Sequence, residues 1–464
     1  MIRRLIALGI VAISVAGSLA AAPTAGPQAV PVAVTIPAGT PSQSPDPRSS
    51  PSPTGSIRPT PSAPAPAPTA TSTGAPSFGA PSATADLVAA LDARLDQLRA
   101  KNGIPGVSVA IVFADGSVWH GESGLADVAA RRAVTADTAF AIASISKTFT
   151  AALIMALVED GRLRLDATVR TYLPRLAIDP AITVRQLLDH TSGLRDFYLS
   201  KGIDKALLAK RGQVWDATRS LAYVGKPFAR PGTSWHYSNT NYLVLGLLAE
   251  AVGRAPVAGQ LRTRFFGPLG LDHTWYQAVE RPRGPVAHGY RFTGLSLKLP
   301  AIDLSDGSSV VPFTSVITAS GAAGSIASTA TDLAQWARAL YGGTVLDDVS
   351  RGAMIADMAL TARLKATIPY GLGVQGVPVA GRPALGHSGR FLGSRAVMRW
   401  IPGDRMAIAV VTNQSRTDPA VLLADLTGLV LRPPSACGGC SPAPSACAAC
   451  SPAPPACAVC SPAP

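Results

Sequence analysis

Two stretches with the pattern of β-hairpins lie at opposite ends of one region of the sequence. Near its beginning, residues 107–113 and 117–120 are short runs rich in β-branched and aromatic side chains, separated by a turn. Near its end, residues 394–400 and 406–412 repeat this arrangement. The long middle has mostly helical and loop patterns. Strands at both ends with helices between them predict an α+β fold: an antiparallel sheet built from both ends of the domain, flanked by helices, with a mostly helical inserted subdomain.

Four helices are predicted from the spacing of the apolar residues. Residues 86–99 have helical periodicity and end at a turn signal. Residues 148–158 and 242–253 are almost continuously apolar, which is typical of helices buried in a core. Residues 422–431 are expected to close the domain as a final helix. The globular hydrophobic pattern therefore spans residues 85–432.

The residues before this domain lack the composition of a folded unit. In residues 1–22, Arg3 and Arg4 precede an apolar run and a cluster of small residues, the pattern of a secretory signal peptide. An uncleaved membrane anchor is the alternative, because the run is nearly long enough to span a bilayer. Residues 23–84 are rich in Pro, Ala, Ser, Thr and Gly and are expected to form a disordered linker. We therefore expect a secreted or extracytoplasmic protein, or one anchored by its uncleaved signal.

Residues 433–464 form a tail with a ten-residue repeat that contains all six cysteines. Each repeat carries one C-x-x-C pair between Ser/Pro/Ala spacers. In an exported chain these pairs could oxidise within the chain or link it to a partner through disulfides. Binding of zinc or another soft metal is the alternative. Because residues 85–432 contain no cysteine, catalysis by cysteine is excluded for the domain.

The chain is basic, with a formal net charge of +13. An exported basic protein would adhere to an anionic cell-wall polymer or to lipid head groups. The alternative is a solvated charge spread over many faces. The basic residues are not clustered with aromatic ones, so no nucleic-acid partner is expected.

The sequence Ser144-Ile-Ser-Lys147 opens the apolar stretch 148–158. Residues three apart in a helix are about one turn apart and share a face, so the serine hydroxyl and the lysine amine are expected to meet. A serine at its ordinary pKa is a poor nucleophile and needs such an adjacent base. The alternative interpretation is a polar N-cap before a buried helix.

Two further short motifs carry polar side chains that could face one site. In Tyr237-Ser238-Asn239 the first and third residues would point the same way in an extended loop, although an N-cap with a packed tyrosine is the alternative. Residues 386–389, Gly-His-Ser-Gly, precede the last hairpin, and in a strand the residues at positions 387 and 389 would share one face. A single histidine such as His387 in a turn is more often structural than catalytic.

The order S-x-x-K, Y-S-N, H-x-G resembles the serine penicillin-recognising enzymes: class C β-lactamases, D-alanyl-D-alanine carboxypeptidases, and the esterases and peptidases that share their fold. Further similar segments are residues 183–194, 323–333 and 370–373. The likeness extends over nearly all of residues 85–432. It implies the β-lactamase/transpeptidase-like form of the α+β fold.

The resemblance implies a catalytic role for three residues. Ser144 would attack a carbonyl carbon and form an acyl-enzyme, and Lys147 and Tyr237 would share the proton transfers. Lys147 must be partly neutral to act as a base, so its pKa should be depressed. Tyr237, close to Lys147, is expected to be easier to ionise. No cofactor and no catalytic metal are expected, since the histidines show no H-E-x-x-H spacing.

The resemblance also implies a substrate-binding role for Asn239, His387, Gly389 and Arg390. Asn239 would hold a substrate amide, and His387 would sit at the rim, where many relatives carry a lysine. The backbone N–H groups of Ser144 and Arg390 would form the oxyanion hole. Arg390 is large where a small residue is common, so it could bind a substrate carboxylate or narrow the site.

These features predict an exported serine acyl hydrolase that acts on D-alanyl-D-alanine peptides of peptidoglycan or on small esters. A class C β-lactamase is one alternative, and a catalytically silent penicillin- or peptidoglycan-binding module is another. An α/β-hydrolase is disfavoured because the sequence has no G-x-S-x-G elbow. The S-D-N and K-T-G motifs of class A β-lactamases are also missing from the sequence.

Overall fold

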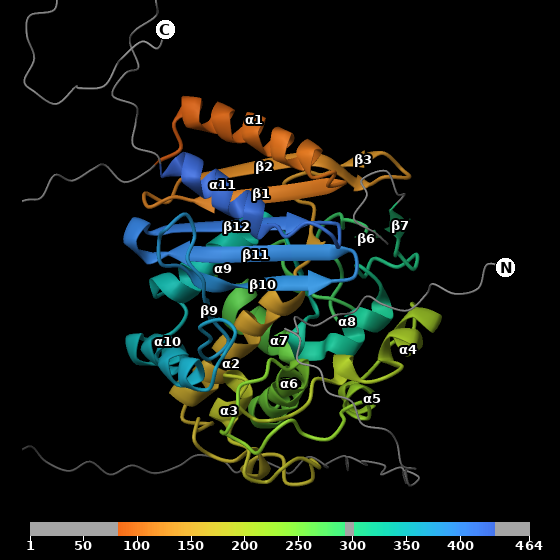
Figure 1. Cartoon of the computed structure of the whole chain (residues 1–464), viewed down its shortest axis with the longest axis vertical. Coiled ribbons are helices and arrows are strands. Elements are labelled where there is room, and N and C mark those ends of the chain that lie inside the picture. Colours follow the sequence, from red (N-terminus) through yellow and green to blue (C-terminus); the bar gives the residue numbers. More distant parts are fainter. Residues whose placement is uncertain (1–81, 293–300, 432–464) are drawn as a thin grey trace, which may run out of the picture. The chain divides into compact units, whose positions relative to one another are not determined.

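The computed structural model describes residues 82–292 and 301–431. In this part of the chain, an antiparallel seven-stranded sheet has the order β3-β2-β1-β12-β11-β10-β9 (Figure 1). Its strands are β1 (Gly106–Val112), β2 (Val118–Asp127), β3 (Arg132–Ala133), β9 (Gln375–Gly376), β10 (Leu385–Phe391), β11 (Ser394–Ile401) and β12 (Met406–Thr412). β1 pairs directly with β12, with Val107 opposite Thr412, so the first and last hairpins join side by side. The predicted sheet built from both ends of the domain is confirmed.

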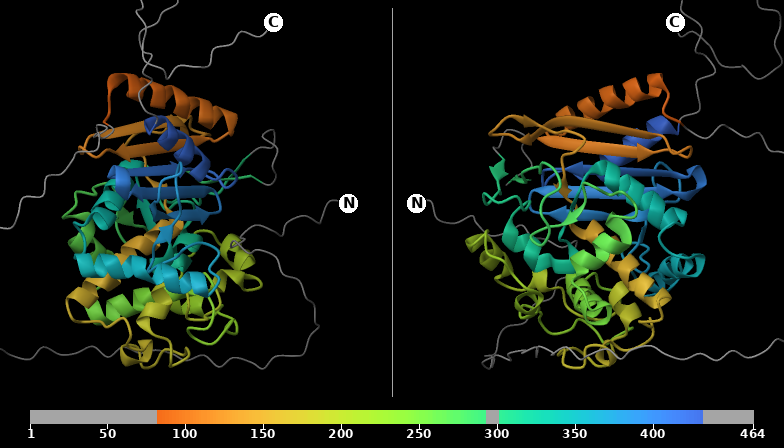
Figure 2. Two further views of the ribbon diagram at one scale, coloured as in Figure 1. Left: turned by 60° about the vertical axis from the view of Figure 1, so that its left-hand side comes forward. Right: turned by 180° about the vertical axis from the view of Figure 1, so that it is seen from behind.

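Helices cover both faces of this sheet (Figures 1 and 2). One face packs against α1 (Ala85–Lys101) and α11 (Ala420–Val430), and the other against α9 (Ala330–Gly342). Successive side chains of a strand point to opposite faces. In β1, Val109 accordingly belongs to the core under α1 and α11, while Ala110 belongs to the core shared with α9. Every residue of β1 is buried, as expected for a strand covered on both sides.

The segment between β3 and β9 is mostly helical and confirms the predicted insertion. Its helices are α2 (Ser146–Glu159), α3 (Val184–Leu188), α4 (Ile203–Ala209), α5 (Ala217–Leu221), α6 (Asn239–Gly253), α7 (Val257–Leu261), α8 (Thr314–Ser320), α9 and α10 (Asp348–Arg363). Short 3₁₀ or π turns are η1 (Ala143–Ile145), η2 (Val169–Thr171), η3 (Phe197–Leu199), η4 (Arg262–Phe266) and η5 (Gly321–Ala323), with η6 (Pro402–Asp404) between β11 and β12. Two small sheets pair β4 (Phe140–Ala141) and β5 (Trp275–Tyr276) with β8 (Ile326–Ser328), and β6 (Tyr290–Arg291) with β7 (Ile302–Asp303).

α2 lies in the middle of the helical part, below the sheet in Figure 1, where it packs against α6 and α7. Its residues from Ser146 to Leu157 are all buried, which explains why its sequence is apolar on every side. Phe149 stacks on Trp336 of α9 with ring centroids 4.0 Å apart. The Trp336 indole N–H donates to the Thr148 hydroxyl at 2.9 Å. α2 is therefore held against α9 by packing and by a buried hydrogen bond, which fixes the position of its first turn.

Residues 386–389 lie within β10, which pairs with β11 and with β9. The shared strand face expected for this segment is therefore confirmed, and the alternative of a turn is wrong. The predicted signal peptide (1–22), almost all of the linker (23–84) and the tail (433–464) lie outside the described residues. Within the described ranges, no single helix is long and apolar enough to cross a membrane. The consecutive helices Asn239–Gly253 and Val257–Phe266 reach that length and apolar character only when they are taken together, and the chain bends by 75° between them.

Candidate active site

Ser144 lies in η1, immediately before α2. The preceding residue, Ala143, is fully buried and has a φ of +47°. A left-handed conformation costs a non-glycine residue on the order of 1–3 kcal/mol and persists where the surrounding structure enforces it. The tight turn leads into α2 and sets the Ser144 hydroxyl beside Lys147, one turn further along the helix, as the S-x-x-K spacing predicts.

The amine of Lys147 is completely buried and has three oxygen neighbours. Its Nζ lies 3.1 Å from Ser144 Oγ, 2.7 Å from Asn239 Oδ1 and 2.9 Å from the carbonyl oxygen of Ala323. An amide oxygen and a carbonyl oxygen can only accept hydrogen bonds. A neutral amine has two N–H groups and one lone pair. The two acceptors therefore take both N–H groups and leave the lone pair facing the Ser144 hydroxyl.

The electrostatics of the site favour this neutral amine. Burial lowers the pKa of Lys147 to about 7, because desolvation disfavours the ammonium form, while the charge of Asp196 partly opposes the shift. Near neutral pH a large fraction of Lys147 is therefore unprotonated. A neutral amine within hydrogen-bond reach of a serine hydroxyl meets the requirement for a general base.

Tyr237 precedes α6, and its ring lies near the amine of Lys147. Lys147 Nζ lies 5.1 Å from the centroid of its ring, which also packs against the ring of His190 at 4.3 Å. Burial raises the pKa of Tyr237, and an interaction with the Ser144 side chain opposes this only in part. The expectation that Tyr237 is easier to ionise is therefore wrong for this structure. Its phenol is a neutral O–H group, suited to donating a proton.

Asn239, the first residue of α6, has both ends of its amide engaged by the protein. Its Oδ1 accepts from Lys147, and its Nδ2 donates to Asp196 Oδ2 at 2.8 Å. If Asn239 also holds a substrate amide, as predicted, it would do so through its second Nδ2 hydrogen or the second lone pair of its Oδ1. Asp196 is fully buried and was not identified from the sequence. It lies two residues beyond the similar segment 183–194, where a single acidic residue carries no distinctive signal.

Gly389 brings β10 against the turn that carries the nucleophile. A Cβ atom at this position would lie 2.0 Å from the carbonyl oxygen of Ile142 and 3.2 Å from the backbone nitrogen of Ser144. Only glycine permits this approach. The strand that carries Arg390 thus runs directly beside the Ser144 N–H, as an oxyanion hole formed by these two backbone groups requires. Their joint use remains a prediction.

His387 does not sit at the rim, contrary to expectation. Its side chain is buried, 1% exposed, and faces the core of the helical part rather than solvent. Burial lowers its pKa to about 3, with a further contribution from the charge of Lys147. The imidazole is therefore neutral over the physiological range and cannot replace the lysine of relatives as a cationic anchor.

The polarity of a buried hydrogen-bond chain fixes the tautomer of His387. The backbone N–H of Ser238 donates to His190 Nδ1 at 3.2 Å, so a neutral His190 carries its proton on Nε2, 3.2 Å from the Tyr370 hydroxyl. Tyr370 then donates to His387 Nε2 at 3.0 Å. His387 Nδ1–H in turn donates to the carbonyl of Ser388 at 2.6 Å. The chain connects the loop of the Y-S-N motif with strand β10.

His190 and Tyr370 were not predicted as site residues. Both are fully buried, and burial lowers the pKa of His190 well below its ordinary value. His190 also has a φ of +66°, which marks it as a constrained position. The sequence offered a signal in hindsight, since each residue belongs to a segment already noted for its similarity, 183–194 and 370–373.

Arg390 projects from β10 and is exposed. No residue in the described ranges forms a hydrogen bond or an ion pair with its guanidinium. A cation in the strand next to Ser144 is therefore free to meet a substrate carboxylate, which is one of the two roles expected for it.

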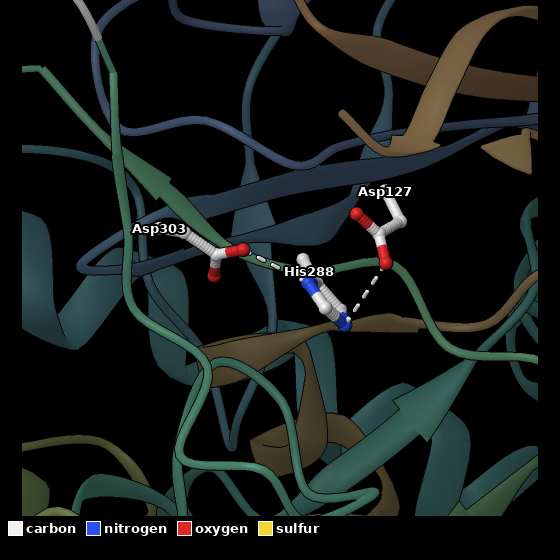
Figure 3. Close-up of side chains that lie close together, drawn as sticks. All are labelled: Asp127, His288 and Asp303. Atoms are coloured by element: carbon white, nitrogen blue, oxygen red, sulfur yellow. Dashed lines mark hydrogen bonds and ion pairs between the residues drawn. The ribbon is translucent and has the colours of Figure 1, made fainter. Parts of the chain in front are cut away.

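In the described part of the chain, one group of three side chains has the spacing of metal ligands, and it lies outside this site. Figure 3 shows His288 between Asp127 and Asp303. Its Nδ1 is 2.9 Å from Asp303 Oδ2, and its Nε2 is 3.7 Å from Asp127 Oδ2. Each nitrogen thus faces one carboxylate on opposite edges of the ring. One ligand atom from each residue lies within 4.8 Å of the other two, and the same atoms already pair with one another within the protein.

Comparisons with known proteins identify the family of the chain. The family model described as Beta-lactamase matches residues 91–432, and the chain belongs to this family. It is 30% identical to penicillin-binding protein 4 of Amycolatopsis lactamdurans over 69% of this chain and 84% of that protein. It is 34% identical to esterase EstB of Burkholderia gladioli, over 44% of this chain and 55% of the esterase. The D-amino acid amidase of Ochrobactrum anthropi SV3 superposes with a TM-score of 0.62 at 25% identity, covering 75% and 98% of the two chains. The protein is thus a serine hydrolase of the β-lactamase family.

The pH profile tests the state of Lys147. We expect kcat/KM to rise with pH and to level off above about 7, because the base must be unprotonated and its pKa is lowered to about 7. Measurement with a neutral ester avoids titration of the substrate. An acid limb near the ordinary lysine pKa of about 10.4 would contradict a buried, neutral base.

Proposed function

We propose that the protein is an exported acyl hydrolase that forms an acyl-enzyme on Ser144 and acts on D-alanyl peptides or small esters. The observation that carries this proposal is the buried amine of Lys147, 3.1 Å from Ser144 Oγ, with its lone pair directed at the hydroxyl. The proposal accounts for the motif order and for the burial of Lys147.

The first chemical step follows from the positions of three side chains. Ser144 Oγ bonds to the carbonyl carbon while its proton passes to Lys147 Nζ. The negative charge on the carbonyl oxygen is met by backbone N–H groups. When the bond to the leaving group breaks, a proton must reach that group, and the neutral Tyr237 hydroxyl and the new Lys147 ammonium are the available donors. In the second half of the reaction, water attacks the carbonyl carbon of the acyl-enzyme by the same proton transfers, and Ser144 is released.

The substrate class is inferred from charge at the site. The neutral, buried His387 supplies no cation to hold a β-lactam or peptide carboxylate. The exposed Arg390 is a cation that could do so, and a small ester would need neither. The names of the relatives, a penicillin-binding protein, an esterase and a D-amino acid amidase, support acyl compounds of these kinds.

The proposed location is outside the cytoplasm. It rests on the signal-like residues 1–22, the linker-like residues 23–84 and the net charge of +13. Peptidoglycan peptides would be the substrates there and anionic cell-wall polymers the surface to which the protein adheres. An uncleaved signal would anchor it in the membrane, and the cysteine pairs of the tail could link it to a partner.

A substrate panel tests this function. We expect a short p-nitrophenyl ester and a D-Ala-D-Ala peptide to be hydrolysed, and nitrocefin to acylate Ser144 but to be released slowly. The measurement is kcat/KM for each compound, with the Ser144→Ala variant as the background. Nitrocefin turnover approaching the diffusional ceiling of about 10⁸ M⁻¹s⁻¹, with neither other compound cleaved, would identify a true β-lactamase instead.

A further inference from the structure

The carboxylate of Asp196 binds the Nδ2 end of the Asn239 amide, whereas the Oδ1 end binds Lys147. It is fully buried and its two oxygens have different partners. Oδ1 accepts from the backbone N–H of Tyr198 at 3.0 Å and thereby caps η3, whereas Oδ2 accepts from Asn239 Nδ2 at 2.8 Å. Burial raises the pKa of the Asp196 carboxyl, whereas the hydrogen bonds from Tyr198 and Asn239 and the charge of Lys147 oppose that rise. Because an ionised carboxylate offers only acceptors, both contacts have the geometry of the charged form.

We propose that Asp196 is a positioning residue: it fixes the Asn239 amide, which in turn orients the lone pair of Lys147 toward the nucleophile. This inference rests on the proposed function, because it concerns how the base of that reaction is held. Asp196 forms its hydrogen bonds with Tyr198 and Asn239, not with the reacting hydroxyl, and would act only through the amide and through its charge.

The orientation of the amide follows from the polarity of its partners. Because the carboxylate of Asp196 can only accept, the NH₂ end of Asn239 must face it and the oxygen must face Lys147. A rotated amide would set its oxygen against the carboxylate and its N–H groups against those of the amine. The amine would lose one of its two acceptors, and the lone pair would no longer be directed at Ser144.

The charge of Asp196 has a second effect on the same proton transfer. It favours the ammonium form of Lys147, which opposes the desolvation of the amine. The ammonium exists once Ser144 has given up its proton, so the anion stabilises the product of that step. A neutral residue at position 196 would leave the amine a weaker base and move the acid limb of the pH profile to lower pH.

Two substitutions separate this role from the structural one. Asp196→Asn and Asp196→Ser both retain a side chain able to cap η3, but both lose the charge. The serine also loses the reach to Asn239. Asp189→Asn is the matched control, because Asp189 is equally buried, lies seven residues before Asp196 and accepts from the backbone N–H and hydroxyl of Thr191.

For both Asp196 variants we expect kcat for a neutral p-nitrophenyl ester to fall by up to about 10²-fold, as for a misplaced catalytic group, with KM nearly unchanged. The acid limb of kcat/KM should move to lower pH in both variants and stay in place in Asp189→Asn. Adding Asn239→Leu to Asp196→Ser should cost less than the product of the two single losses, because the carboxylate acts in part through the amide.

Three results would overturn the proposal: an unmoved acid limb, a loss of activity that only follows a fall in Tm, or a loss confined to substrates with a free α-amine, which would make Asp196 a substrate contact. If neither variant folds, Asn239→Leu decides alone, and an unchanged kcat would refute the proposal. Wild-type protein without Ser144-dependent turnover would instead refute the proposed function itself.

Discussion

Replacing Ser144 by alanine should lower kcat/KM for every hydrolysed substrate by about 10⁴- to 10⁶-fold, the range found when a nucleophilic serine is removed from a hydrolase. The substitution deletes the one hydroxyl that the lone pair of Lys147 faces. It leaves the buried turn at Ala143 and the packing of α2 in place. Initial rates with a p-nitrophenyl ester over a wide range of enzyme concentration would measure the loss.

Ser146→Ala is the matched control for this loss. Ser146 is a second serine of the same motif and is buried, but its hydroxyl accepts from the backbone N–H of Ile326 at 3.2 Å. Its removal should cost about 1–3 kcal/mol of stability, because that N–H loses its partner, and should leave kcat nearly intact. Equal loss of activity in the two variants would show that the helix start, not the Ser144 hydroxyl, is what matters.

Lys147 and Tyr237 should behave as one proton-transfer unit. Lys147→Met keeps the length of the buried side chain without the amine, and Tyr237→Phe keeps the ring contacts without the hydroxyl. Each should lower kcat by about 10²-fold or more, as expected for lost general acid–base catalysis. The double variant should be little worse than the worse single one, because both groups serve the same transfers.

The test compares kcat of the wild type, the two single variants and the double variant at one pH on the plateau of the pH profile. Losses that multiply in the double variant would mean that the two side chains act in separate steps. A Tyr237→Phe variant with wild-type kcat would assign the whole proton path to Lys147. Thermal unfolding of each variant controls for damage to the fold, since both side chains are packed among aromatic rings.

The sheet and the main helices could be predicted from the sequence because their patterns are local. The alternation in residues 394–400 and 406–412, and the apolar run of residues 148–158, appear in the structure as β11, β12 and α2. At residues 386–389 the sequence left a strand and a turn as alternatives, because two glycines interrupt the pattern. Gly389 is needed for a close approach to the turn before Ser144, which a periodicity argument does not capture.

The candidate catalytic side chains could also be predicted to lie close together, because each belongs to a short motif and the motifs follow a fixed order. Their surroundings could not be predicted, since these come from residues distant in sequence. His387 is buried and forms a hydrogen bond with Tyr370, which lies 17 residues away, and the Asn239 amide is oriented by Asp196. The expected ionisation of Tyr237 failed because desolvation outweighs its interaction with Ser144, and burial of a single phenol cannot be read from sequence.

The most direct test of a covalent mechanism is the mass of the protein after reaction with a penicillin or a fluorophosphonate. Trypsin releases residues 133–147, which contain Ser144 and Ser146 together, so fragment ions must locate the adduct within this peptide. The predicted result is one adduct per chain, on Ser144, that disappears in Ser144→Ala and persists in Ser146→Ala. An adduct that survives Ser144→Ala, or that maps to any other residue, would contradict the assignment of the nucleophile.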